Sequence, residues 1–258
     1  ETMAGRDLDG FMVTVAENRC YLSGYCADDT QFDETAGALL ITANRMVVAT
    51  DARFELQAER EAPNWERFIY KKGLVQQLPE LLRDLGVRRL GFESVRLSVQ
   101  QAGQLRKFLS EAGLDVEPVA TEHIVEDLRL RKSETEIEAL RRALRLAESA
   151  FETVLHSLSA GRSEANLAWD LEKAMRESGA EGLSFPVIAA AGPNAALPHA
   201  VPGSRTVAPG EPVLFDWGAR LEGYCSDISR TVVVGRPDNT FRRVFSTVRE
   251  AQQMAIDA

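Results

Sequence analysis

Two aspartates, Asp216 and Asp227, stand in a stretch that otherwise has the composition of β-strands. Residues 215–231 read FDWGARLEGYCSDISRT, and three valines follow directly. Strand interiors disfavour Asp, so a pair of aspartates in this setting suggests a chemical role. Carboxylates that face each other in a partly buried place repel unless one is protonated or a cation lies between them. A hard divalent metal ion bound by both carboxylates would offset this repulsion.

The spacing of the two aspartates predicts how they pair. Leu221-Glu222-Gly223 breaks the apolar run and is typical of a turn. A hairpin symmetric about the Leu221–Glu222 bond puts Asp216 directly opposite Asp227, with Cβ atoms roughly 4.5–5.5 Å apart. Cys225 and Ser229 then share the face of Asp227, whereas a three-residue loop would put the two aspartates on opposite faces. The alternative without a metal is a pair of solvent-facing acids on an edge hairpin, which the apolar neighbours disfavour.

Composition argues against several classes of function. The 258 residues allow one large domain or two modest ones, and the net charge of −9 disfavours a nucleic acid or an anionic membrane as the main partner. No apolar run approaches the roughly 18–20 residues that span a bilayer, and the first residues lack the pattern of a signal peptide. Cys20, Cys26 and Cys225 are odd in number and match no zinc motif. We therefore expect free thiols and a cytoplasmic protein.

The elements that must position the aspartates differ between the two halves of the chain. Strand and helix signals alternate up to about residue 122, which predicts a sheet with helices packed on it. Residues 123–133 are expected to connect the halves. Ser133 and Glu136 then form a capping box, and an apolar stripe at steps of three or four predicts a long helix that runs to about residue 158. A second capped helix, the strands with the aspartates and an amphipathic helix over 241–258 complete the pattern.

The second half resembles the start of the pita-bread metallopeptidases, a family that includes methionine aminopeptidase, aminopeptidase P, prolidase and creatinase. The likeness rests on RLRKSETEIEALRRA, FPVIAAAG, PHAVPG, DWG and SDISRT, and the first half adds NRCYLSGY and TDARFELQAERE, which resemble the creatinase-type N-terminal domain. The resemblance implies an α/β creatinase-like N-terminal domain (1–122), a connector (123–133) and an α+β pita-bread catalytic domain of which only the first half is present (134–258).

The resemblance also implies roles for three residues. Asp216 and Asp227 match the family's first two ligands to a pair of divalent ions, for which Mn²⁺ is the expected metal and Co²⁺ or Zn²⁺ are alternatives. His199, in LPHAVP, matches a loop histidine that contacts the substrate and the tetrahedral intermediate and is not a ligand. Without the resemblance, a single histidine in a Pro-rich loop would more often be a surface residue.

The creatinase-type N-terminal domain favours the branch of the family that cleaves Xaa-Pro bonds. The expected substrate is therefore a dipeptide or short peptide with proline in second position, and a homodimer is expected because the family often forms dimers. Neither a nucleic acid nor a membrane is expected as a partner.

The chain departs from the family's pattern after Asp227. The remaining ligands, a histidine in a Gly-His motif and two glutamates, have no counterpart, and no histidine follows His199. The chain is thus either a fragment of a longer enzyme, which the unterminated helical pattern at its end favours, or a non-catalytic binding module. A metal-free hydrolase of the creatinase type is a third interpretation, against which the two aspartates argue. We expect little peptidase activity from residues 1–258 alone.

Overall fold

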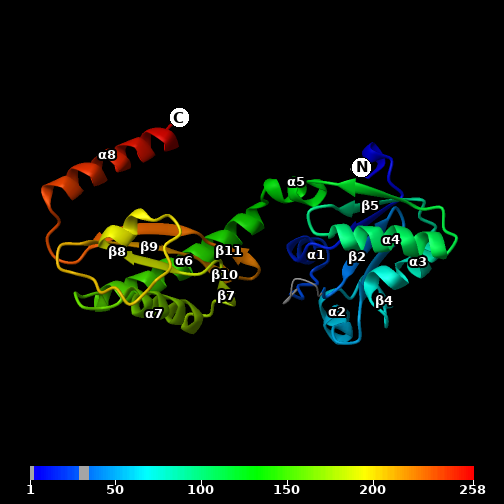
Figure 1. Cartoon of the computed structure of the whole chain (residues 1–258), viewed down its shortest axis with the longest axis horizontal. Helices are drawn as coiled ribbons and strands as arrows, with labels where there is room; N and C mark the ends of the chain where they lie inside the picture. The colour runs from blue at the N-terminus through cyan, green and yellow to red at the C-terminus, as the bar shows by residue number, and fades with distance from the viewer. Residues whose placement is uncertain (1–2, 29–34) are drawn as a thin grey trace. The chain divides into compact units, whose positions relative to one another are not determined.

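The computed structural model describes residues 3–28 and 35–258. The chain divides after Arg131 into two units, Glu1–Arg131 and Lys132–Ala258 (Figure 1). Among the described residues, no helix combines the length and the apolar character that crossing a bilayer requires.

The first unit is built on a six-stranded sheet with the order β4-β3-β2-β1-β5-β6. Strand β2 runs antiparallel to β1 and β3, and the other neighbouring pairs are parallel, so the five strands other than β2 end at the same edge of the sheet. The elements of this unit are η1 (Ala4–Arg6), β1 (Gly10–Val13), α1 (Ala16–Ser23), β2 (Ala38–Thr42), β3 (Met46–Thr50), α2 (Glu55–Glu61), β4 (Glu66–Ile69), α3 (Leu74–Leu85), β5 (Arg89–Glu93), α4 (Val99–Glu111), β6 (Glu117–Thr121) and α5 (Ile124–Leu130).

Both faces of this sheet are buried. One face packs against α3 and α4 through a cluster that includes Met12, Leu82 and Leu105. The other face packs against α2 and α5 through a second cluster that includes Val13, Ala58, Ile124 and Val125. The range that the sequence suggested as a connector is therefore largely a helix, α5, whose first turn belongs to the core of the first unit.

The second unit contains two three-stranded sheets, with the orders β12-β9-β8 and β11-β10-β7. Helices α6 and α7 lie on one side of β8 and β9 (Figure 1), and they share a core with these strands that includes Phe151, Leu167 and Phe215. The elements are α6 (Glu134–Ser157), α7 (Glu164–Glu177), β7 (Gly182–Leu183), β8 (Ile188–Ala191), η2 (Gly192–Ala196), β9 (Pro212–Trp217), β10 (Ala219–Leu221), β11 (Tyr224–Cys225), β12 (Ile228–Val233) and α8 (Asn239–Ile256).

The helix starts of the second unit follow the capping signals in the sequence. The Ser133 hydroxyl accepts a hydrogen bond from the Glu136 amide and the Glu136 carboxylate accepts one from the Ser133 amide, which is the predicted capping box. Ser163 caps α7 in the same way through the Asn166 amide. Helix α8 also forms, but none of its residues is buried, and Val244, Phe245 and Val248 of its predicted apolar stripe are exposed.

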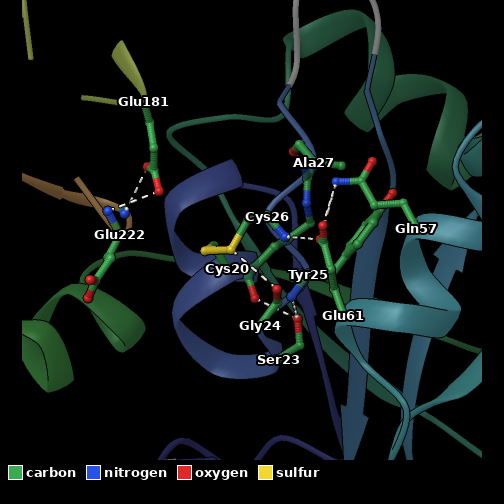
Figure 2. Close-up of a disulfide and its surroundings, with 12 residues drawn as sticks. Cys20, Ser23, Gly24, Tyr25, Cys26, Ala27, Gln57, Glu61, Glu181 and Glu222 are labelled. Carbon is green, nitrogen blue, oxygen red and sulfur yellow. Dashed lines mark hydrogen bonds between the residues drawn. A yellow bond between two sulfur atoms is a disulfide. The ribbon is translucent and has the colours of Figure 1, made fainter. Parts of the chain in front are cut away.

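The prediction of free thiols is wrong for two of the three cysteines. Cys20 and Cys26 form a disulfide with a Cα–Cα distance of 4.4 Å (Figure 2). Cys225 is free and exposed. Cys20 lies in the last turn of α1, which ends at Gly24 in a left-handed conformation. The chain reverses there, which brings Cys26 back beside the helix. The spacing alone did not indicate this reversal, and the argument for a reducing compartment from free thiols no longer holds.

Candidate functional site

The predicted direct pairing of Asp216 with Asp227 is wrong. The hairpin turns at Glu222 and Gly223, which both have positive φ (51° and 75°), as a two-residue turn of type I′ requires. Asp216 consequently lies opposite Ser229. The sequence prediction centred the turn one residue too early, because it treated Leu221 as part of the loop, whereas Leu221 pairs with Tyr224 as a strand residue.

The two aspartates nevertheless share a face of the hairpin. Ser229 is on the face of Asp216 because the two are directly paired, and Asp227 precedes Ser229 by two positions. Burial follows the same alternation, since Ser226 and Ile228 are buried while Asp227 and Ser229 are exposed. Diagonal neighbours lie roughly 7–8 Å apart rather than 4.5–5.5 Å, so the carboxylates repel less strongly than direct opposition would imply.

The core fixes the direction in which Asp216 points. Its neighbours Phe215 and Trp217 are buried against α6, where Trp217 stacks on Phe151 with ring centroids 4.3 Å apart and donates from Nε1 to the Ala147 carbonyl at 2.9 Å. Because side chains alternate along β9, Asp216 must project from the opposite face of the sheet.

Gly218 separates β9 from β10 and allows the strand to leave one sheet for the other. A Cβ at this position would lie 1.9 Å from the Ser226 carbonyl oxygen, which is main chain and cannot yield. Each residue of the DWG motif thus has its own role: Asp216 projects its carboxylate from the sheet, Trp217 packs in the core, and Gly218 lets the main chain lie close to Ser226.

Asp216 Oδ1 is buried and has no hydrogen-bond partner in the described part of the chain. A buried carboxylate oxygen without a donor is unfavourable, and a cation would satisfy it. Asp227, on the same face, supplies a second hard oxygen donor. Within residues 3–28 and 35–258, no group of three or more His, Cys, Asp or Glu side chains is arranged to hold a metal ion. The two aspartates therefore fit part of a carboxylate metal site.

His199 lies in the loop between η2 and β9 and is exposed. The loop packs on the face of the sheet that carries Asp216, because Ala200 forms a buried cluster with Ile188 and Ala190, and Ile188 is the direct partner of Asp216 across β8 and β9. The structure thus brings the loop of His199 to the sheet face of the aspartates.

Glu164 binds the main chain on both sides of His199, at the end of β8 and within the loop, and the sequence analysis did not single it out. The residue begins α7 and is 1% exposed. Its Oε1 accepts from the Ala191 amide at 2.8 Å and from Asn194 Nδ2 at 3.0 Å, and its Oε2 accepts from the Gly203 amide at 3.2 Å. In the sequence, a glutamate after a serine cap indicates only a helix start, so this role had no visible signal.

Comparison with known protein families matches both halves of the chain. The Creatinase/Prolidase N-terminal domain matches residues 1–131 and Metallopeptidase family M24 matches residues 138–258. The chain is 33% identical over 249 residues to the uncharacterized peptidase YqhT of Bacillus subtilis, covering 96% of this chain and 67% of that protein. It is 28% identical over 259 residues to the Xaa-Pro dipeptidase of Pyrococcus horikoshii, covering 100% of this chain and 69% of that protein.

Solved structures give the same result. The Xaa-Pro dipeptidase from Bacillus anthracis superposes with a TM-score of 0.88 at 33% identity, covering 98% of this chain and 68% of that chain. The prolidase from Pyrococcus horikoshii OT3 superposes with a TM-score of 0.84 at 28% identity, covering 99% of this chain and 69% of that chain.

Proposed function

Because the chain belongs to the M24 metallopeptidase family and carries that family's creatinase/prolidase N-terminal domain, we propose that the protein hydrolyses Xaa-Pro bonds in dipeptides or at the N-termini of short peptides. The observation that carries the proposal is the shared face of Asp216 and Asp227, with one buried carboxylate oxygen unpartnered in the described chain, beside the loop of His199. Relatives named as Xaa-Pro dipeptidases support the choice of substrate.

The family and fold class expected from the sequence are confirmed. The first unit is the creatinase-like α/β domain and the second is part of a pita-bread domain. The chain covers 67% to 69% of the relatives and structures described above.

Each residue of the site has a distinct proposed role. Asp216 and Asp227 would hold divalent ions, with Mn²⁺ as the first choice and Co²⁺ or Zn²⁺ as alternatives. The chemistry that such ions supply is polarisation of the peptide carbonyl and activation of a water molecule. His199, on the loop above the same sheet face, would donate a hydrogen bond to the oxygen of the attacked carbonyl as negative charge develops on it. A peptide with proline second is the proposed partner, and a homodimer is the proposed state.

The metal role is tested by Mn²⁺ titration of the protein and its Asp216→Asn and Asp227→Asn variants. Each substitution keeps the side-chain shape but removes one negative charge, so we expect each to weaken Mn²⁺ binding by about tenfold or more. Asp115→Asn is the matched control, since Asp115 is exposed in the other unit. Equal Mn²⁺ binding by wild type and both site variants would refute the metal assignment.

Activity is tested in parallel with Ala-Pro-type substrates and added Mn²⁺. Residues 1–258 are expected to turn over slowly or not at all, because two carboxylates leave most coordination positions to water. If the reading frame continues past Ala258, the longer product should be active, and His199→Ala should slow it while leaving its metal content near normal. Metal-independent turnover would instead favour the creatinase-like alternative.

A further inference from the structure

The first unit contains a cleft that the proposed peptidase site does not use. It has a volume of about 640 Å³, within the range of small-molecule sites. Its walls come from the segments that follow β1, β3, β4 and β5, together with the first turn of α3 and one side of α4. These strands are parallel, so the cleft lies outside their carboxyl ends, which is where α/β sheets bind ligands.

The cleft is cationic in a protein whose net charge is −9. Among the residues that the structure describes, Arg53, Lys71, Lys72 and Arg96 line the cleft, against a single acid, Asp51. Asp51 is paired with Arg53 at 2.9 Å. Within the described chain, neither Lys71 nor Lys72 forms an ion pair with a carboxylate. Two adjacent ammonium groups thus remain available to an anion.

The segment that carries the lysines is held in place before any ligand arrives. The main-chain amides of Lys71 and Lys72 both donate to Gln77 Oε1, at 2.5 and 2.9 Å. Helix α3 begins directly after Gly73, a glycine N-cap that has no side chain to cap the first turn, and this turn lines the cleft. The free amides and the dipole of a helix N-terminus favour a phosphate at that position.

Tyr70 provides an independent indication of a ligand. The residue is only 5% exposed and lines the cleft, yet its hydroxyl has no hydrogen-bond partner in the part of the chain that the structure describes. The hydroxyl is not among the fully buried unpaired atoms of the described chain, so it opens into the cleft, where it can donate a hydrogen bond to a molecule that enters. Burial also raises the pKa of the Tyr70 phenol, which keeps the hydroxyl protonated as a donor.

We propose that this cleft binds a small phosphomonoester whose phosphate contacts Lys71, Lys72 and the start of α3, and whose apolar or aromatic group lies beside Leu97 and Phe108. Two lysines and a helix N-terminus match a dianion better than a singly charged carboxylate. The apolar side chains at the other wall give the organic group a surface that inorganic phosphate would leave empty.

Calorimetric titration of the whole chain with phenyl phosphate, inorganic phosphate and benzoate tests the proposal. Phenyl phosphate should bind most tightly, inorganic phosphate more weakly, and benzoate at least about tenfold more weakly than phenyl phosphate. The double variant Lys71→Gln/Lys72→Gln should weaken phenyl phosphate binding about tenfold or more, and Tyr70→Phe by about three- to fivefold. Far-UV circular dichroism and melting temperature check that each variant is folded.

The control is Lys107→Gln/Lys173→Gln, which removes the same charge from lysines outside the cleft that each pair with a glutamate on their own helix. It should leave the affinity unchanged. The proposal is overturned if phenyl phosphate does not saturate by about 10 mM, if benzoate binds equally well, or if the cleft double variant binds like the control. Because binding here does not depend on metal or peptide hydrolysis, its failure leaves the peptidase proposal untouched.

Discussion

Asp216 is held in place by its neighbours rather than by bonds of its own. Phe215 and Trp217 commit the strand to one orientation by burying their rings on α6, and the carboxylate projects on the other side without a partner for Oδ1 in the described chain. A side chain fixed by packing and left unsatisfied is ready for a ligand, because binding requires little reorganisation.

Glu164 differs from Asp216, since its carboxylate accepts hydrogen bonds from main-chain amides on both sides of His199, those of Ala191 and Gly203. In Glu164→Gln, the side-chain oxygen can accept from only one of the two main-chain amides. If it keeps the bond from Ala191, its NH₂ group faces the N–H of Gly203, so that two donors meet. We expect loop opening to become about tenfold more frequent, equivalent to about 1.4 kcal/mol. Hydrogen exchange at the amides of Ala191 and Gly203 measures this change.

Glu134→Gln is the matched control for the loop. Glu134 also follows a serine cap at the start of a helix, but it is exposed. Both variants lose the same charge at a helix N-terminus, so only contacts to the loop distinguish them. Equal exchange at Ala191 and Gly203 in the two variants would show that Glu164 does not position the loop.

Glu93 predicts a pH dependence of the first unit. Burial raises its pKa above the ordinary 4.5, although the Val15 amide, Asn18 and the Thr14 amide donate to it and act in the other direction. The folded state therefore holds the Glu93 proton more tightly than the unfolded state does, and this tighter binding stabilises the fold. The stabilisation is complete below the pKa of Glu93 in the unfolded chain and is lost as the pH rises through its pKa in the folded chain. The free energy of unfolding of wild type relative to Glu93→Gln should therefore decrease from pH 4 upward. Denaturant titrations at about pH 4, 5, 6 and 7 measure it, and an increase would contradict the sign.

At the scale of elements, periodicity and capping signals predicted most of the second unit. The starts of α6 and α7 followed from the serine caps, Ser133 and Ser163. Helices α1 and α2 were missed because they are only eight and seven residues long and bury few side chains, which in α1 are the polar Asn18 and Arg19. The hairpin register and the disulfide were missed because each depends on left-handed residues, Glu222 and Gly24, whose conformation follows from the completed fold.

The docking of the hairpin on α6 depends on Phe151. Its ring stacks on Trp217 and meets Phe215 edge to face with centroids 5.2 Å apart. Phe151→Ala should lower the free energy of unfolding of the second unit by about 3–5 kcal/mol, because it removes both aromatic contacts and leaves a cavity. Phe151→Leu, which keeps most of the volume, should cost much less. Denaturant titration followed by tryptophan fluorescence compares the two, and a loss below about 1 kcal/mol for Phe151→Ala would contradict the central place of this ring.

At the scale of the whole molecule, each unit has its own core. The clusters around Leu82 and around Val13 are formed by residues of the first unit, and the cluster around Phe151 by residues of the second. The cationic cleft lies in the first unit, and the aspartates and His199 lie in the second. Ligand sites and stability can therefore be perturbed separately, which is the expected behaviour of two domains with independent cores.

Calorimetric melting of the whole chain tests this independence with two core variants. Leu82 is 0% exposed in the first unit, and Leu82→Ala should cost about 2–5 kcal/mol there. Each kcal/mol lowers the melting temperature of a unit of this size by about 3–5 °C, so the transition of the first unit should fall by about 6 °C or more while the second stays in place. Phe151→Ala should move only the transition of the second unit.

Phenyl phosphate should raise the melting temperature of the first unit alone, because ligand binding stabilises only the unit that binds it. It should still do so in Phe151→Ala. A single transition that both variants shift equally would mean that the two units unfold as one cooperative body.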